Sequence, residues 1–300
     1  RADVWSISIF SGSDLRTLAP HPLVGDRPVL CAADVTDTRA VFVADPFIWR
    51  SGTAWHMFFE VYAKEAQRGV ISHATSANGV EWKYDRVVLE EHFHLSYPQV
   101  FEHEGQFYMT PETGEAGEVR LYRAEPFPGK WLLDSVLLRG RYYDPTVLLR
   151  GERWWMWVCD EQYTPLLFSA AALRGPWLPH ECNARAKPDL RFGRPGGRTI
   201  QRNGEVLRFV QDALPTYGSR LHALRVDALE EGRYAESAWM EDPILRGTTS
   251  GWRATGMHHL DAWPSTDTAW IAAVDGNCQR LVFNWRAGAR RIQRWLAGPR

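Results

Sequence analysis

The sequence is poor in lysine and cysteine and has no long apolar run. Of its 35 basic residues only 4 are lysines, and the formal net charge is −1. A net charge so close to zero gives no overall field that would favour nucleic acid or an anionic membrane. Without a stretch of about 18 apolar residues, no segment is long enough to span a bilayer. We therefore expect a protein that neither binds nucleic acid nor crosses a membrane.

The four cysteines argue against two further classes of protein. Cys31, Cys159, Cys182 and Cys278 are widely separated, and none forms a C-x-x-C pair. Such spacing does not fit a zinc knuckle, and four scattered thiols are too few for a disulfide scaffold. The sequence also has no loop of the EF-hand type. With no signal peptide at the start, we expect reduced thiols, a cytoplasmic location, and neither cofactor nor bound metal.

Arginine, tryptophan and short strand patterns are abundant. The other basic residues are all arginines, which pair bidentately with carboxylates or phosphates, although a GC-rich genome would also favour arginine. The 15 tryptophans suit sheet cores and sugar-stacking surfaces alike. Short runs of Val, Ile, Phe, Tyr and Trp alternate with Gly, Pro, Asn and Asp, and helical periodicity is almost absent. This pattern predicts strands and turns throughout.

The strands recur as a repeated unit of two strands, the second of which ends in an acidic residue. The five copies are VFVADPFIWRSGTAWHMFFEVY, HLSYPQVFEHEGQFYMTPETG, YYDPTVLLRGERWWMWVCDEQ, GRPGGRTIQRNGEVLRFVQDALP and MHHLDAWPSTDTAWIAAVDGN. A repeat of about 50 residues with four short strands is typical of a propeller blade. We therefore predict an all-β, five-bladed β-propeller with four-stranded blades.

The predicted propeller is a single domain over residues 1–300. Its blades start near residues 41, 94, 142, 193 and 257. Third strands are expected in register, the last of them at QRLVFNW (279–285). Two N-terminal segments remain, WSISIF (5–10) and PVLC (28–31). One of them is expected to supply the outer strand of the last blade and so close the ring without an open sheet edge.

Equivalent residues of the innermost strands form a ring at one mouth of a propeller channel. The predicted ring is Asp45, Tyr97, Asp144, Arg194 and Asp261, with His94, Arg198, His258 and His259 close by in sequence. The acids that end the second strands form a layer around it, namely Glu60, Glu112, Asp160, Asp212 and Asp275. Crowded carboxylates repel each other, so at least one acid is expected to have a raised pKa. Adjacent residues on a strand face opposite ways, so metal binding by the two histidines is not expected.

The residue types in this ring have two interpretations. They differ from blade to blade, which favours a functional site placed on a repeated scaffold. Alternatively, Asp-Pro at the start of a strand is only a turn device.

Several segments together resemble a known domain. These are VADPFIW, HLSYPQVF, LYRAEPFPGKW, GRPGGR, YGSRL and MHHLDAW, which cover about residues 40 to 275. In this order they resemble the propeller domain of plant glucosamine inositolphosphorylceramide transferases and its bacterial relatives. That domain in turn looks like the five-bladed propellers of glycoside hydrolase families 43, 32 and 68.

The resemblance to these hydrolases implies roles for three acids. Asp45 would be the base or nucleophile, and Asp144 would orient the substrate. The general acid, commonly a Glu before a Pro in the fourth blade, is replaced here by Arg194. An arginine cannot donate a proton at working pH, and hydrolysis by two carboxylates needs an acid. Glu112 and Glu161 are the nearest candidate donors.

The loop FGRPGGR, which carries Arg194, also has two interpretations. An arginine beside the N–H groups of a glycine-rich turn favours a phosphate or a sugar carboxylate. Alternatively, the loop is a tight turn whose arginine pairs with Asp45 or Asp144.

The sequence leaves two functions open. The first is a glycosidase or transglycosylase acting on a charged or phosphorylated glycan at the channel mouth. The second is a non-catalytic module that binds a glycan or positions an acceptor for a glycosyltransferase or other sugar-modifying domain. In either case the candidate substrate-binding residues are His94, Tyr97, Arg194, Arg198, Asp212, His258, His259 and Asp261.

Overall fold

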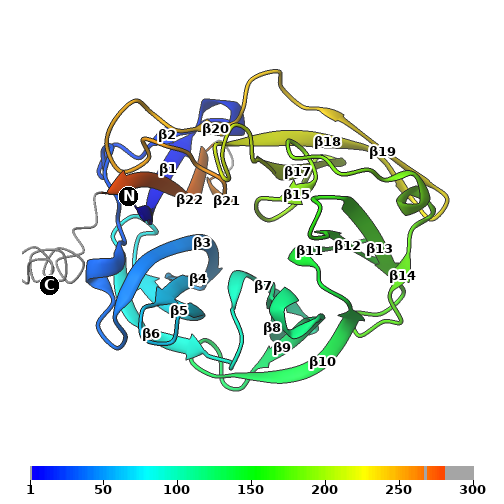
Figure 1. Cartoon of the computed structure of the whole chain (residues 1–300), viewed down its shortest axis with the longest axis horizontal. Helices are drawn as coiled ribbons and strands as arrows, with labels where there is room; N and C mark the ends of the chain where they lie inside the picture. The colour runs from blue at the N-terminus through cyan, green and yellow to red at the C-terminus, as the bar shows by residue number, and fades with distance from the viewer. Residues whose placement is uncertain (1, 267–268, 281–300) are drawn as a thin grey trace, which may run out of the picture.

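The computed structural model describes residues 2–266 and 269–280, and these form five β-sheets arranged in a ring (Figure 1). The first blade is β3 (Ala40–Ser51), β4 (Ala54–Ala63), β5 (Arg68–Ser76) and β6 (Lys83–Leu89). The second is β7 (Ser96–His103), β8 (Gln106–Glu112), β9 (Glu118–Ala124) and β10 (Trp131–Arg139). The third is β11 (Tyr143–Arg150), β12 (Arg153–Cys159), β13 (Pro165–Ala170) and β14 (Leu178–Pro179). This arrangement confirms the predicted all-β, five-bladed propeller.

The fourth blade has an interrupted inner strand. Its main path is β15 (Arg194–Pro195), β17 (Glu205–Asp212), β18 (Arg220–Glu230) and β19 (Arg233–Ala238). Two short strands complete the sheet, β16 (Ile200–Arg202) on β17 and β20 (Leu245–Arg246) on β18. Short 3-10 helices lie in the connections of the chain, at η1 (Leu15–Thr17), η2 (Ala32–Asp34), η3 (Gly114–Ala116) and η4 (Glu181–Arg185). None of the helices in the described ranges is long and apolar enough to cross a membrane.

The fifth blade combines both ends of the described chain. Its order is β21 (Leu260–Thr266), β22 (Ala269–Arg280), β1 (Ala2–Gly12) and β2 (Ala19–Pro20). The third strand is therefore β1, and the prediction of QRLVFNW at this position was wrong. Gln279 and Arg280 belong to β22, where they pair with Asp3 and Ala2, and residues 281–285 lie outside the described residues.

One of the two N-terminal segments does join the last blade, but not as its outermost strand. WSISIF lies within β1, while Leu30 of PVLC forms only an isolated bridge with Ile7. The outermost strand is β2 instead. β1 lies next to β22 for a physical reason. β22 is long, and the eleven residues of β1 can satisfy the backbone hydrogen-bonding groups of β22 along its length.

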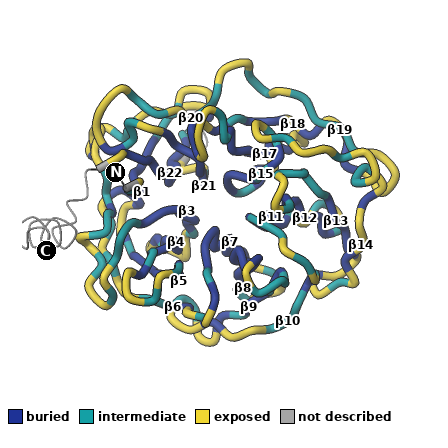
Figure 2. The backbone as a smooth tube through the Cα atoms, viewed as in Figure 1, coloured by how far each residue is buried: buried dark blue, intermediate teal, exposed yellow. Residues whose placement is uncertain are grey.

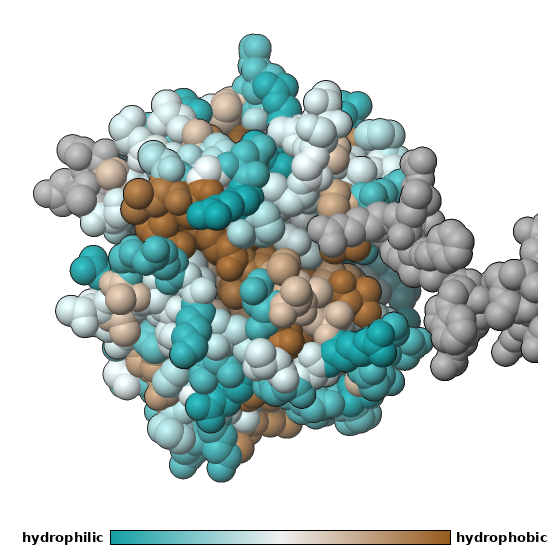
Figure 3. Space-filling view, turned by 90° about the vertical axis from the view of Figure 1, so that its left-hand side faces the viewer, coloured by the Kyte–Doolittle hydropathy of each residue, from teal (hydrophilic) through white to brown (hydrophobic). Residues whose placement is uncertain are grey.

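Apolar side chains fill the space within and between the blades, and Figure 2 shows buried backbone throughout the inner strands. Three blades share one turn device that involves tryptophan. The indole N–H groups of Trp82, Trp131 and Trp177 donate to the carbonyls of Gly79, Pro128 and Leu173. On the side seen in Figure 3, a band of apolar surface lies between polar areas.

Gly197, in the interruption between β15 and β16, links three blades. Its amide donates to the Tyr97 hydroxyl at 2.7 Å, and it forms a bridge with Leu260. Its φ is +143°, and a Cβ atom would collide with the Leu260 carbonyl oxygen. The close approach of three inner strands therefore requires glycine here.

We expect Gly197→Ala to destabilise the protein by about 2–4 kcal/mol, because backbone strain and steric overlap add. Urea unfolding at neutral pH measures the change. Gly232→Ala is a matched control, since no atom lies within 4 Å of the position of its Cβ. Equal stability of the two variants would contradict the expected role of Gly197.

Candidate functional site

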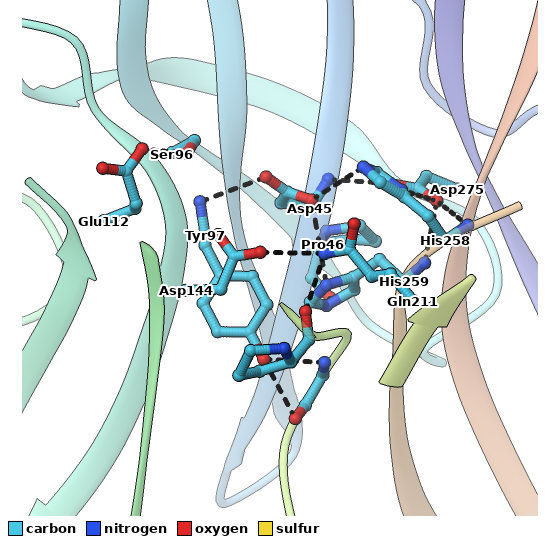
Figure 4. A network of polar contacts seen from close by, with 12 residues as sticks. Asp45, Pro46, Ser96, Tyr97, Glu112, Asp144, Gln211, His258, His259 and Asp275 are labelled. Atoms are coloured by element: carbon cyan, nitrogen blue, oxygen red, sulfur yellow. Dashed lines mark hydrogen bonds and ion pairs between the residues drawn. The ribbon is translucent and has the colours of Figure 1, made fainter. Parts of the chain in front are cut away.

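Three blades present a polar side chain at the same irregularity of the inner strand. Asp45, Tyr97 and Asp144 have φ values of +53°, +49° and +50°, and each precedes a proline. At each of them the register with the second strand shifts, as it does at a β-bulge. Such left-handed backbone is uncommon for these residue types, and bulges re-aim side chains. The three residues lie close together at the centre of the ring (Figure 4).

Asp45 is held by the neighbouring blades on both sides. Its Oδ2 accepts from the Tyr97 amide, and its own amide donates to Asp275. His258 Nε2 and His259 Nδ1 lie 3.6 and 3.8 Å from its Oδ1. Burial raises the pKa of Asp45 to about 7, an effect that His258 opposes and Asp275 reinforces. Asp45 is thus a carboxyl group that can both release and accept a proton near neutral pH.

Asp275 anchors the two histidines. It accepts hydrogen bonds from the amides of His258 and His259 and lies 2.8 Å from His258 Nδ1. Burial alone would raise the pKa of Asp275, but His258, His259 and the Asp45 amide together outweigh burial, and the pKa is lowered. The pKa of His258 is raised despite its burial, because Asp275 and Asp45 stabilise the charged ring. Asp45, His258 and Asp275 each offer a ligand atom within 4.8 Å of the others, yet most of the lone pairs of Asp275 are already engaged.

The prediction that His258 and His259 face opposite ways does not hold. Both residues precede β21 and are not part of the strand, so strand alternation does not apply to them. Each ring approaches Asp45 within 4 Å.

Asp144 is neutralised by the arginine of the glycine-rich loop. Arg194 Nε and Nη2 donate to the two Asp144 oxygens at 2.6 and 3.3 Å, and Gln211 donates to Oδ2 at 2.8 Å. The guanidinium lies over the rings of Tyr143 and Tyr217, at 5.4 and 5.2 Å. Of the two interpretations of FGRPGGR, the structure therefore contains the turn whose arginine pairs with Asp144.

Glu112 lies at the end of β8, and in Figure 4 it is on the side of Asp45 opposite His258 and Asp275. Its oxygens accept from the Gly114 amide at 2.6 Å and the Ser96 hydroxyl at 3.2 Å. Burial raises its pKa to about 7, and repulsion from Asp144 contributes. Crowding therefore acts as the sequence predicted, but burial is the larger cause.

Glu60 occupies the same register in the first blade as Glu112 does in the second. Its Oε1 is buried, has no hydrogen-bond partner among the described residues, and lies 3.5 Å from His94 Nε2. The Gly69 amide donates to His94 Nδ1, so a neutral His94 carries its proton on Nε2 and directs it towards Glu60. Burial, followed by repulsion from Asp45, raises the pKa of Glu60 well above its usual range.

Three predicted acids are not part of this cluster. In the third blade the register of Glu60 and Glu112 is occupied by Cys159, because Asp160 comes one residue later and closes a turn. Glu161 is half-exposed and pairs with Arg141 at 3.0 Å. Asp212 is buried, but its contacts are the Leu214 amide, Arg220 and His222.

Asp261 and Arg198 lie farther along the channel than Asp45. Asp261 accepts from the amide of Ile48, three residues beyond Asp45, and from Arg198 at 2.8 and 3.1 Å. Arg198 also donates to the carbonyl of Val100. The prediction that Asp261 belongs to the ring at the mouth was therefore wrong, because the fifth blade has no register shift at this point and its inner strand is offset. Together, Asp261 and Arg198 brace three inner strands below the mouth.

Tyr217 is a site residue that the sequence did not single out. It is 43% exposed, packs edge-on against His258 at 5.3 Å and contacts the guanidinium of Arg194. The segment YGSRL, which contains Tyr217, carried part of the resemblance. Nothing in that segment indicated that the Tyr217 side chain lies at the channel mouth. Gln211 was also missed, although it occupies the register of Glu112 in the fourth blade.

Two further atoms complete the description of the site. Gln211 Oε1 and His259 Nδ1 are buried and, like Glu60 Oε1, have no hydrogen-bond partner among the described residues. Buried polar atoms are normally satisfied, and exceptions gather at functional sites. Three such atoms in one acidic cluster favour a site that receives polar groups from a ligand.

The fold and site define a five-bladed β-propeller with a buried cluster of acids and histidines at one end of its channel. The chain belongs to the family described as glucosamine inositolphosphorylceramide transferase 1, N-terminal, whose model matches residues 3–277. It is 31% identical to glucosamine inositolphosphorylceramide transferase 1 of Oryza sativa subsp. japonica and 30% identical to that of Arabidopsis thaliana. These matches cover 91% of this chain but only 40% and 39% of the plant proteins.

Solved structures similar to the chain share the propeller fold. The catalytic domain of the GH62 α-L-arabinofuranosidase from Coprinopsis cinerea has a TM-score of 0.61 at 13% identity, covering 81% of this chain and 92% of that domain. An exo-1,5-α-L-arabinanase from a bovine ruminal metagenomic library has a TM-score of 0.57 at 12% identity, covering 78% and 92%. At these identities the similarity establishes the fold alone.

Proposed function

We propose that this propeller is a carbohydrate-active protein, a glycosidase or transglycosylase that works at the mouth formed by Asp45, Glu112 and Asp144. The observation that carries the proposal is the pair of buried carboxyls, Asp45 and Glu112, whose pKa values are both raised to about 7. They come from adjacent blades, and a proton donor and acceptor matched to neutral pH are what glycosyl transfer requires. The names of the plant relatives and the hydrolase neighbours support a carbohydrate ligand.

Each acid has a proposed role. Asp45 acts as base or nucleophile, while Glu112 donates the proton that Arg194 cannot supply. Asp144, fixed by Arg194 and Gln211, orients the sugar. The half-exposed Glu161 is the weaker candidate donor, because its exposed pair with Arg141 gives it no buried environment.

The proposed ligand carries a phosphate or carboxylate at the rim. Asp144 engages Nε and Nη2 of Arg194, and Nη1 has no hydrogen bond to any described residue. An anionic group would be repelled by the acids around Asp45 but could accept a hydrogen bond from Nη1 of Arg194. Tyr217 is 43% exposed beside the Arg194 guanidinium and offers a surface on which a sugar ring can stack.

Asp45→Asn and Glu112→Gln are each expected to lower turnover by about 10²–10⁴-fold, the usual contribution of a general acid or base. The measurement is release of product from a panel of aryl glycosides and phosphorylated oligosaccharides. Glu161→Gln is the matched control and should retain full turnover. Equal activity of Glu112→Gln and wild type, with Glu161→Gln inactive, would reassign the donor.

A second candidate function, a glycan-binding module, is favoured by Arg194 at the place of the expected donor. The chain also spans only about two-fifths of the plant relatives it matches. In that case wild type would show no turnover on any member of the panel. Tyr217→Ala would still weaken binding of the same oligosaccharides, as isothermal calorimetry can measure.

A further inference from the structure

We propose a second carbohydrate-binding site, at the far end of the channel from the acids, in the groove between the fourth and fifth blades. The groove is an open surface groove with a volume of about 570 Å³, and it lies beside β16 and the later part of β21. Its volume falls within the range of about 300–1,000 Å³ typical of small-molecule sites. Its residues are separate from the acid cluster, so this site does not rest on the proposed function.

One wall of the groove is aromatic. Trp263 is partly exposed and stands edge-on to Trp49, with ring centroids 5.0 Å apart. The Arg198 guanidinium lies 5.5 Å from the centroid of the Trp263 ring, and Trp270 and Pro264 extend the apolar surface. Since Trp49 and Arg198 hold the Trp263 ring in place, the indole is a rigid platform against which the apolar C–H face of a sugar can pack.

The opposite wall carries polar groups. Thr199 is only 5% exposed, and its Oγ1 has no hydrogen-bond partner within the described part of the chain. The side chain of Gln201 is exposed two residues further along. A hydroxyl and an amide beside an indole match the mixed apolar and hydroxylated faces of a sugar ring.

The proposed ligand is a neutral sugar that packs on the aromatic wall. Two arginines line the groove, and the guanidinium of Arg202 lies 5.1 Å from the centroid of the Trp270 ring. Arg198 gives two of its nitrogens to Asp261, so its charge is already neutralised. A smaller cavity of about 260 Å³ shares Ile200, Arg202 and Trp270 with the groove and continues it towards Trp239. The continuation suits an oligosaccharide better than a single sugar.

The test uses the tryptophan indole N–H signals of the whole chain in NMR titrations with neutral cellotriose, arabinotriose and β-1,3-galactotriose. At least one probe should shift the Trp263 signal saturably, and Trp263→Ala should weaken that binding at least tenfold. Tyr217→Ala, at the acid mouth, should leave it unchanged. No saturable Trp263 shift with any probe at millimolar concentration, or undiminished binding by Trp263→Ala, would overturn the proposal.

A second variant covers the case in which Trp263→Ala fails to fold after losing its packing on Trp49. Thr199→Val removes the hydroxyl while keeping nearly the same shape, and it should weaken binding of the same probe severalfold. If Thr199→Val binds as wild type does while Trp263→Ala is unfolded, the proposed site is wrong.

Discussion

Replacing Arg194 with methionine is expected to destabilise the protein by about 3–5 kcal/mol at neutral pH. The reason is that Asp144, 1% exposed, would be left as a buried charge without its bidentate partner. Arg194→Lys should cost less, about 1–2 kcal/mol, because lysine keeps the charge but loses the two-donor fork. Urea unfolding followed by tryptophan fluorescence measures both changes.

The matched control is Arg141→Met. Arg141 also pairs with a carboxylate, Glu161, at 3.0 Å, but both side chains are about half exposed. Exposed pairs contribute little, so this variant should change stability by less than about 1 kcal/mol. Equal losses for Arg141→Met and Arg194→Met would mean that the Arg194–Asp144 pair does not hold the mouth together. A stable Arg194→Met that no longer binds anionic glycans would give the arginine a role in ligand binding only.

Glu112→Gln is expected to make the protein more stable than wild type at pH 9, by about 2–3 kcal/mol, and to change little at pH 5. The pKa of Glu112 is raised to about 7 in the fold, from 4.5 in the unfolded chain. A group whose folded pKa is raised contributes stability at low pH and loses it as pH rises through the folded value. Glutamine mimics the protonated carboxyl and keeps hydrogen bonds to Gly114 and Ser96, so it avoids that loss.

The comparison of the two proteins at each pH removes the contributions of other titrating groups. His56 and His259 have pKa values lowered by burial and oppose the acids below neutral pH, so the stability of wild type alone is not a clean measure. Glu161→Gln should show no such pH-dependent gain. A Glu112→Gln variant that is no more stable than wild type at pH 9 would mean that Glu112 ionises freely in the fold.

The Glu112 prediction describes a group of buried carboxyls that lowers stability. Asp45, Glu60 and Glu112 are buried, and burial raises the pKa of all three. Apolar residues at these positions would avoid the cost of burying carboxyls. A cluster that costs stability in this way is consistent with selection for function.

The sequence by itself determined the number of blades and the residues from which the site is drawn. Strand propensity and the period of about 50 residues are local properties, so the first four repeats each carry the strands of one blade. The fifth repeat supplies only β21 and β22, and its blade is completed by β1 and β2 from the N-terminal end. The acids that end the second strands were visible for the same reason, and Glu60 and Glu112 do occupy one register.

Only the tertiary structure decided which of these residues meet. Asp160 comes one residue after the position that Glu60 and Glu112 occupy in their blades, and the missing register shift in the fifth blade places Asp261 farther along the channel. The pairing of Arg194 with Asp144 joins residues fifty positions apart. Repeats reveal periodicity, but bulges and the approach of neighbouring blades depend on packing between segments distant in the chain. For that reason the sequence predicted a polar mouth in which at least one carboxyl has a raised pKa, while the closed ring decided which carboxyls are buried and which acid pairs with Arg194.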